Sequence, residues 1–265
     1  MKPLIRWAGS KRKLLPYLKT FWNGTFTRYV EPFAGSACLF FDLEPDVAML
    51  GDTNRELVAT YKAIRSDPEA VYDILRQIPS NKSSYYAFRE QAPTDKHGFL
   101  AAARFIYLNR FCFNGIYRTN MAGKFNVPFS GEGTGAIPDL KHLQNVSRQL
   151  QKAKIYGSDF ENILDKTVEG DFVYLDPPYS VENRRVFKQY GPSIFGLEDL
   201  DRLSKQLFAL DKKRVKFVVS YAYCREALEK FGSWMVTRKL TTRNISGFAE
   251  HRKKAVELMF TNILT

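Results

Sequence analysis

Four consecutive residues, Asp176-Pro177-Pro178-Tyr179, place a carboxylate, a rigid backbone and an aromatic ring next to one another. They follow the apolar run Phe172–Leu175, which is typical of a buried strand. Two successive prolines cannot continue a sheet, so the carbonyl groups beyond the strand lack strand partners. In open α/β sheets, ligands bind at the carboxyl ends of strands. A planar base with an amino group could donate hydrogen bonds to these oxygens and stack on the ring. An ordinary turn is the alternative.

A second segment, Tyr29–Ala37, runs from an expected strand into a turn of small residues, which lets a ligand approach the backbone. It is not a dinucleotide fingerprint, because Gly35 is its single glycine, and Gly9–Lys11 lacks the upstream glycine of a phosphate loop. Asp52 ends the next expected strand, where an acidic residue can accept hydrogen bonds from both hydroxyl groups of a ribose. The alternative for Asp52 is a carboxylate satisfied by backbone donors. A nucleoside-bearing ligand without pyrophosphate suits this segment.

Strand-like runs alternate with helical patterns along most of the chain. These runs are Arg28–Glu31, Val47–Asp52, Lys154–Gly157, Phe172–Asp176, Lys216–Tyr221, Met235–Leu240 and Val256–Thr261. Thr53–Glu56 has the pattern of a capping box before a helix. This alternation predicts an α/β protein with a mostly parallel sheet covered by helices.

The middle of the chain lacks strands of the buried type. Helical patterns at Tyr85–Gln91 and Phe99–Phe111 precede a loop rich in glycine, asparagine and serine, Asn114–Gly135. We therefore expect residues 55–139 to form a helical insertion in a domain made of residues 1–54 and 140–265.

The composition narrows the class of protein. With 40 Lys and Arg against 28 Asp and Glu in 265 residues, the net charge is +12, which attracts polyanions such as nucleic acid. The three cysteines are far apart, which indicates a reducing compartment and argues against a disulfide framework or a zinc site. No apolar run of about 18 residues occurs, and the histidines lack metal-ligand spacing. We expect a cytoplasmic protein without a membrane segment or a required metal.

Further motifs accompany these segments in a fixed order. They are Arg6–Lys11, Glu31–Gly35, Leu50–Asn54, Tyr107–Arg110, Asn114–Arg118, Phe125–Phe129, Asp176–Tyr179, Arg243–Ser246, Arg252–Lys254 and Glu257–Leu258. Over almost its whole length the chain resembles the Dam-type DNA adenine-N6 methyltransferases, the D12 class in the alpha group of amino-methyltransferases. The resemblance implies a Rossmann-like S-adenosylmethionine-dependent methyltransferase sheet with an inserted, mostly helical target-recognition domain that carries a hairpin near residues 112–130.

The resemblance implies S-adenosyl-L-methionine as the cofactor. Trp7 and Lys11 would lie along its methionine end, and Asp52 would hold its ribose. Asp159 would accept a hydrogen bond from the amino group of the cofactor's adenine, while Phe160 would pack on or beside the adenine ring. The full set of expected cofactor-binding residues is Trp7, Lys11, Glu31, Phe33, Gly35, Asp52, Asp159, Phe160 and Asp176. Ala37 departs from the family, many of whose members have glycine there.

The implied substrate is an adenine in double-stranded DNA, which must be flipped out of the duplex to reach such a pocket. Tyr179 would stack on the base, while Asp176 and the Pro177 carbonyl accept its amino hydrogens. These bonds free the nitrogen lone pair to attack the methyl group, so catalysis is mainly alignment and charge placement. Pro178 completes the rigid corner. We expect a monomer.

The implied DNA-contacting residues are Phe113, Asn114, Ile116, Arg118, Pro128, Arg184, Arg185 and Lys188. Arg118 would bind a guanine edge, Ile116 would touch a thymine methyl group, and Phe113 and Asn114 would fill the gap beside the flipped base. Phosphate contact is the alternative for Arg118, and a solvated loop is the alternative for the basic residues of 184–188. The expected target is GATC or a related short site.

Other functions compete with this one. Methylation of cytosine N4 in DNA or of adenine in RNA uses the same chemistry, but such enzymes usually have serine or asparagine in place of Asp176. A catalytically inactive DNA-binding protein is the alternative from another class, against which the intact Asp176–Tyr179 motif, Asp52 and Lys11 argue.

Overall fold

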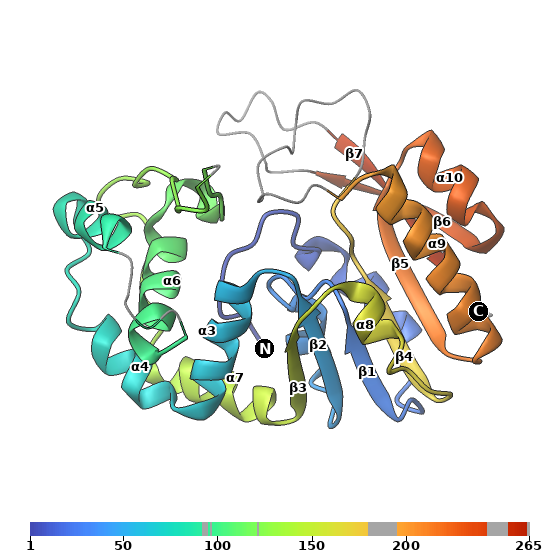
Figure 1. Ribbon diagram of the computed structural model, residues 1–265, viewed down its shortest axis with the longest axis horizontal. Coiled ribbons are helices and arrows are strands. Elements are labelled where there is room, and N and C mark those ends of the chain that lie inside the picture. Colours follow the sequence, from blue (N-terminus) through green and yellow to red (C-terminus); the bar gives the residue numbers. More distant parts are fainter. Residues whose placement is uncertain (92–94, 96, 121, 180–194, 243–253, 264–265) are drawn as a thin grey trace.

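A mixed sheet flanked by helices runs through the protein (Figure 1). The computed structural model describes all residues except 92–94, 96, 121, 180–194, 243–253 and 264–265. The strands are β1 (Arg28–Glu31), β2 (Ala48–Asp52), β3 (Ala153–Gly157), β4 (Asp171–Leu175), β5 (Lys216–Ala222), β6 (Met235–Thr242) and β7 (Lys254–Thr261).

The α-helices are α1 (Leu15–Leu18), α2 (Cys38–Leu43), α3 (Arg55–Ser66), α4 (Pro68–Leu75), α5 (Lys82–Glu90), α6 (Phe99–Phe111), α7 (Leu140–Gln151), α8 (Phe160–Leu164), α9 (Leu197–Lys212) and α10 (Arg225–Phe231). Short 3-10 helices span Arg12–Leu14, Lys19–Phe21, Phe113–Gly115 and Gly232–Trp234. None of the described helices combines the length and the apolar character that crossing a membrane requires.

The order of the strands creates a switch point. It is β3-β2-β1-β4-β5-β7-β6, with β1 to β5 parallel and β7 antiparallel to both β5 and β6. This confirms the predicted α/β fold with a mostly parallel sheet. The chain proceeds from β1 to β2 and β3 on one side, and β4 and β5 then lie on the other side. The order reverses between β1 and β4, and open α/β sheets bind ligands at the carboxyl ends of the strands at such a point.

Alternate residues of the central strands face two separate cores. Tyr29 and Phe172 are buried with residues of α2, α3, α6 and α7 on one face of the sheet. Val30 and Val173 are buried with residues of α8, α9 and α10 on the other face. Because both faces are covered, the central strands are almost continuously apolar in sequence.

Helices α4, α5 and α6 lie beyond the β3 edge of the sheet in Figure 1. Helix α3 packs against both α6 and β3. Buried residues of α3 and α6 also belong to the same core as one face of the sheet. The helical part is therefore tied to the sheet by packing, and its proposed limits, residues 55–139, stay a prediction.

The start of α3 differs from the sequence-based expectation. The helix begins at Arg55, and Asn54 caps it by accepting a hydrogen bond from the backbone N–H of Leu57 at 3.0 Å. The capping box predicted from Thr53 is therefore wrong. The reason is that Asp52 Oδ1 accepts a hydrogen bond from the backbone N–H of Asn54 at 2.8 Å, which fixes the cap one residue later.

Glu31 is a buried acidic residue at the end of β1. Its side chain is 2% exposed, and its Oε2 accepts a hydrogen bond from the Tyr29 hydroxyl at 3.0 Å. Burial raises the pKa of Glu31 well above its ordinary value, and the nearby Asp176 and Asp52 raise it further, against the lowering effect of Tyr29.

Glu31→Gln should change how stability depends on pH. A carboxyl group whose pKa is raised by folding makes its full contribution to the stability of the folded state below its unfolded-state pKa of about 4.3. This contribution is lost as the pH rises through the folded-state pKa. Glutamine does not ionise. In urea unfolding, the free energy of unfolding of Glu31→Gln relative to the natural protein should therefore increase from pH 4 upward and then level off. Glu132→Gln, at an exposed position, is the control. Parallel pH curves for Glu31→Gln and the natural protein would contradict the raised pKa.

Candidate active site

Acidic side chains gather where four parallel strands end. Glu31 and Asp52 are the last residues of β1 and β2, Asp176 follows β4, and Asp159 lies just beyond β3. Parallel strands bring their carboxyl ends to one edge of the sheet, and Glu31 and Asp176 flank the switch point between β1 and β4. The electrostatic effect of Asp52 and Asp176 on the pKa of Glu31 reflects this proximity.

Asp176 is held in a fixed orientation. Its Oδ1 accepts hydrogen bonds from Lys11 Nζ at 2.6 Å and from the Ser220 hydroxyl at 3.1 Å. Burial raises the pKa of Asp176, and the ammonium group of Lys11 is the largest influence that lowers it. Within the described residues, no hydrogen bond engages Oδ2. One oxygen is thus anchored, and the other is left to accept from a ligand.

The aromatic ring of the motif is also positioned. The Tyr179 hydroxyl donates to Glu257 Oε2 of β7 at 2.7 Å, and its ring meets the Tyr221 ring edge-on at a centroid distance of 5.0 Å. Lys11 Nζ lies 5.0 Å from the centre of the Tyr179 ring. Pro177 is buried and Pro178 is exposed. Carboxylate and ring are therefore presented together at the end of β4.

The turn after β1 brings backbone close to an indole. Gly35 has a φ of +46°, and a Cβ atom there would lie 2.7 Å from the Trp7 ring, so a side chain does not fit. Ala37 also adopts the left-handed conformation, with φ 48°, at a cost of about 1 kcal/mol for an L residue.

Asp52 accepts two backbone hydrogen bonds, from the N–H of Gly35 at 2.9 Å and of Asn54 at 2.8 Å. This is the alternative arrangement considered for Asp52 from the sequence. Each carboxylate oxygen has a further lone pair, so the geometry orients the group toward the turn and still permits it to accept from a ribose.

Beyond β3, Asp159 belongs to a charged cluster centred on Arg202 of α9. Asp159 Oδ1 accepts from the backbone N–H of Glu161 at 3.0 Å and from Arg202 Nη2 at 2.7 Å. Arg202 also pairs with the carboxylates of Glu161 and Asp199, each at 2.7 Å. Its guanidinium lies 4.8 Å from the centre of the Phe160 ring.

The Phe160 ring is 3% exposed, because Phe33, 5.3 Å away, and Arg202 cover it. Little of this ring is open to a ligand. Phe33 and Phe195 are half-buried and form a cluster with it, with Phe195 at centroid distances of 6.0 and 6.2 Å from Phe33 and Phe160. Phe33 and Phe195 therefore have more ring surface available.

The segment from Cys112 to Phe129, termed here the 112–129 segment, folds back on itself. Antiparallel bridges join Cys112 with Phe129 and Thr119 with Phe125. Phe113 is 42% exposed and its N–H donates to the Pro128 carbonyl at 2.9 Å.

Three further residues of this segment were singled out from the sequence. Asn114 adopts a left-handed conformation with φ 56°. Ile116 is half-buried. Arg118 is half-buried and donates to Asn126 across the segment.

Residues 6 and 7 connect this segment to the sheet. The backbone N–H of Arg6 donates to Asn109 Oδ1 at 2.8 Å, and Asn109 Nδ2 donates to the Arg6 carbonyl at 2.7 Å. A Cβ atom on Gly115, whose φ is +63°, would lie 2.5 Å from the Arg6 side chain. The Trp7 ring stacks on Tyr117 at a centroid distance of 5.7 Å.

The structure brings the expected cofactor-binding and catalytic residues to one edge of the sheet, and it places Phe113, Asn114, Ile116, Arg118 and Pro128 together on the 112–129 segment. Arg184, Arg185 and Lys188 lie outside the described residues. Their roles, like those of all these residues, stay predictions. Within the described residues, no group of three or more His, Cys, Asp or Glu side chains is arranged to hold a metal ion.

Three residues in contact with this edge escaped the sequence-based selection: Ser220, Glu257 and Arg202. Ser220 and Arg202 carry no local signal, because their partners come from distant elements. Glu257 lies within one of the shared motifs, and a buried acidic residue in an apolar strand was the signal that could have identified it.

A mostly parallel sheet with acidic side chains at its switch point is typical of the Rossmann-like methyltransferases. Residues 7–256 match the model of the D12 class N6 adenine-specific DNA methyltransferases, and the chain belongs to this family.

Several curated proteins are similar to the chain over nearly its full length. Type II methyltransferase M1.LlaDCHI of Lactococcus lactis subsp. cremoris is 31% identical over 99% of this chain and 95% of its own. Type II methyltransferase M.MjaIII of Methanocaldococcus jannaschii is 31% identical over 99% of both chains. The DNA adenine methylase of Escherichia coli strain K12 is 28% identical over 97% of this chain and 94% of its own.

Lys11→Met should raise the pKa of Asp176 further, because the opposite charge that favours the ionised carboxylate is lost. Titration of ¹³C-labelled aspartate carboxyl groups by NMR measures this, with Asp176→Asn to assign the signal. Lys19→Met removes a surface ion pair with Asp42 (3.2 Å) and should leave the Asp176 pKa unchanged. An identical Asp176 pKa with and without Lys11 would contradict the coupling.

Proposed function

We propose that this adenine-specific DNA methyltransferase transfers the methyl group of S-adenosyl-L-methionine to the N6 amino group of an adenine flipped out of duplex DNA. The observation that carries the proposal is the corner after β4. There Asp176 has one oxygen anchored by Lys11 and Ser220, and the Tyr179 ring is fixed by Glu257. A carboxylate acceptor beside an aromatic ring fits a planar base with an exocyclic amine.

The acidic edge suits a cationic donor. The pKa values of Glu31, Asp52 and Asp176 are all raised by burial, so a positive charge nearby is favourable. Bound S-adenosylmethionine would supply a methyl group activated by a sulfonium. Trp7, packed on Gly35, offers an indole face for cation–π attraction to that charge. Asp52 is oriented by two backbone donors to accept from the ribose hydroxyls.

Asp159 and the phenylalanine cluster suit the adenine of the donor. Asp159 Oδ1 is engaged by Arg202 and Glu161, whereas Oδ2 makes no hydrogen bond within the described residues. We expect Oδ2 to accept the adenine amino group. Phe33 supplies the flat apolar contact, with the buried Phe160 behind it.

At the target base, Asp176 Oδ2 and the Pro177 carbonyl would accept the two amino hydrogens while Tyr179 stacks on the ring. These bonds orient the nitrogen lone pair toward the methyl carbon. S-Adenosylmethionine would supply the methyl group, its S–C bond breaking as the N–C bond forms. Asp176 would accept a hydrogen bond from the amino group, which would lose its extra proton to solvent. Lys11 lowers the pKa of Asp176 against the effect of burial and so favours the carboxylate form, which offers acceptors on both oxygens.

Target choice would lie in the 112–129 segment, within a recognition domain of residues 55–139. Arg118 would bind a guanine edge, Ile116 would touch a thymine methyl group, and Pro128 would also contact the DNA. The exposed Phe113 and its neighbour Asn114 would fill the space left by the flipped base. The resemblance through Asn114–Arg118 and Pro128 favours GATC, recognised by a monomer.

Asp176→Ala should reduce methyl transfer more than about 100-fold, because the carboxylate that accepts an amino hydrogen of the adenine is lost. Binding of the donor should be largely retained. The measurement is transfer of labelled methyl groups to duplex DNA, with modified adenines mapped on plasmid DNA. Calorimetry measures donor binding. Asp165→Ala, at an exposed position, is the control. Near-natural transfer by Asp176→Ala would overturn the mechanism. Methylation of cytosines or of RNA in place of DNA adenine would show that the proposed substrate is wrong.

Arg202→Met tests the adenine site through binding of the product S-adenosylhomocysteine. The natural protein should bind S-adenosylhomocysteine more tightly than S-inosylhomocysteine. In the inosine compound a carbonyl oxygen replaces the amino group and would face the Asp159 carboxylate, which needs a donor. Methionine keeps an apolar contact with Phe160 but releases Asp159, so this preference should fall about 5-fold. Arg225→Met removes an exposed pair with Glu229 and serves as control. An unchanged preference in Arg202→Met would rule out the orienting role.

A further inference from the structure

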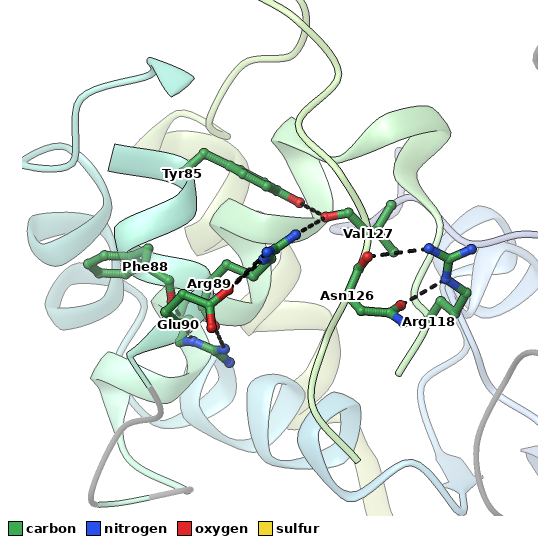
Figure 2. Close-up of polar contacts among 8 residues, drawn as sticks. Tyr85, Phe88, Arg89, Glu90, Arg118, Asn126 and Val127 are labelled. Carbon is green, nitrogen blue, oxygen red and sulfur yellow. Dashed lines mark hydrogen bonds and ion pairs between the residues drawn. The ribbon is translucent and has the colours of Figure 1, made fainter. Parts of the chain in front are cut away.

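Arg118 is held by Asn126 across the 112–129 segment (Figure 2). Arg118 Nε donates to Asn126 Oδ1 at 2.8 Å, and Arg118 Nη2 donates to the Asn126 carbonyl at 3.3 Å. The backbone N–H of Asn126 donates in return to the Arg118 carbonyl at 3.1 Å. Asn126 therefore fixes both the backbone and the guanidinium of Arg118.

The way in which Asn126 binds the guanidinium leaves one edge open. A guanidinium presents a side edge, formed by Nε and one terminal nitrogen, and an end edge, formed by the two terminal nitrogens. Asn126 takes the side edge. Within the described residues no hydrogen bond engages Nη1, so the end edge keeps a parallel pair of donors. Such a pair matches the O6 and N7 acceptors of guanine.

The stretch of chain that carries Asn126 is itself anchored to the helices. The carbonyl of the next residue, Val127, accepts hydrogen bonds from the Tyr85 hydroxyl at 2.9 Å and from Arg89 Nη1 at 3.4 Å (Figure 2). Both donors lie on α5. Arg104 of α6 secures α5 by donating to two carbonyl groups near its end, at 2.7 and 2.8 Å. The position of Asn126 is thus set by the helical layer.

We propose that Asn126 is a positioning residue for target recognition, which holds the side edge of Arg118 so that its end edge faces a guanine. This inference rests on the proposed role of Arg118 as a base-reading residue. A long side chain that is free in solution loses rotamer entropy when it binds a base, and one that is already held loses less. Asn126 therefore increases discrimination between bases without contacting DNA.

Asn120 provides a matched comparison for a purely structural role. It lies at the tip of the same segment, and its Oδ1 accepts hydrogen bonds from the backbone N–H groups of Ala122 and Lys124, both at 3.0 Å. These bonds stabilise the turn and do not involve the Arg118 guanidinium. Asn120→Ala weakens the segment but leaves the Arg118–Asn126 pair in place.

The readout is a selectivity ratio. It is kcat/KM for a duplex with the natural target divided by kcat/KM for duplexes in which each target guanine is replaced by 7-deazaguanine, which lacks N7. Arg118→Ala should lower the ratio about 10-fold at one guanine, and Asn126→Ala should lower it about 5-fold at the same guanine. Asn126→Asp keeps the acceptor oxygen and should retain the ratio even if added negative charge weakens binding to every duplex.

A double-variant cycle separates positioning from folding. In the Arg118→Ala background, Asn126→Ala should cause no further loss of selectivity, because it acts only through Arg118. Asn120→Ala should lower turnover on all duplexes alike and keep the ratio. An additive loss in the double variant, or an equal loss of selectivity in Asn120→Ala, would overturn the inference.

The target is first mapped on plasmid DNA with the natural protein, so the experiment does not depend on GATC. Absence of methylated adenines in that first step would overturn the proposed function, and this inference with it. Methylation accompanied by unchanged selectivity in Asn126→Ala would overturn this inference alone.

Discussion

The burial of like charges at the carboxyl edge of the sheet is the constraint on which the site depends. Glu31, Asp52 and Asp176 end or follow neighbouring parallel strands, so the topology itself brings their carboxyl groups together. Burial opposes the ionised form of each. The Tyr29 hydroxyl, two backbone N–H groups and the Lys11 ammonium each offset part of this effect. A cationic ligand would relieve part of what remains, which supports the proposed donor.

One short stretch of chain near the N-terminus contacts the 112–129 segment, the turn after β1 and the corner after β4. The backbone of Arg6 is paired with Asn109 beside the 112–129 segment, the Trp7 ring contacts the turn at Gly35 and stacks on Tyr117, and Lys11 reaches Asp176. The proposed donor site, the proposed base pocket and the 112–129 segment therefore share one structural element. This element thus helps to fix their relative placement, in addition to the packing between the sheet and the helical part.

The sequence predicts those features that local patterns determine. Residues Arg28–Glu31 and Phe99–Phe111 have the predicted bounds, because both elements are largely buried and their apolar residues stand out in the sequence. The Asp176 corner follows from two prolines after an apolar run. Contacts between distant residues leave no such pattern. Nothing near Arg202 indicates that Asp159 is its partner, and nothing near Asn126 indicates that it binds Arg118 through the side edge of the guanidinium. The helix cap at Asn54 instead of Thr53 likewise depends on a contact, with Asp52.

The position of β7 has a consequence for folding of the chain during its synthesis on the ribosome. This strand follows β6 in the sequence yet lies between β5 and β6, to which it is antiparallel. During synthesis β5 and β6 emerge with their pairing edges exposed, and they cannot join the final sheet until β7 has been made. Glu257, which fixes the Tyr179 hydroxyl, arrives on that same strand. A nascent chain therefore cannot complete the proposed base pocket before β7 has been made.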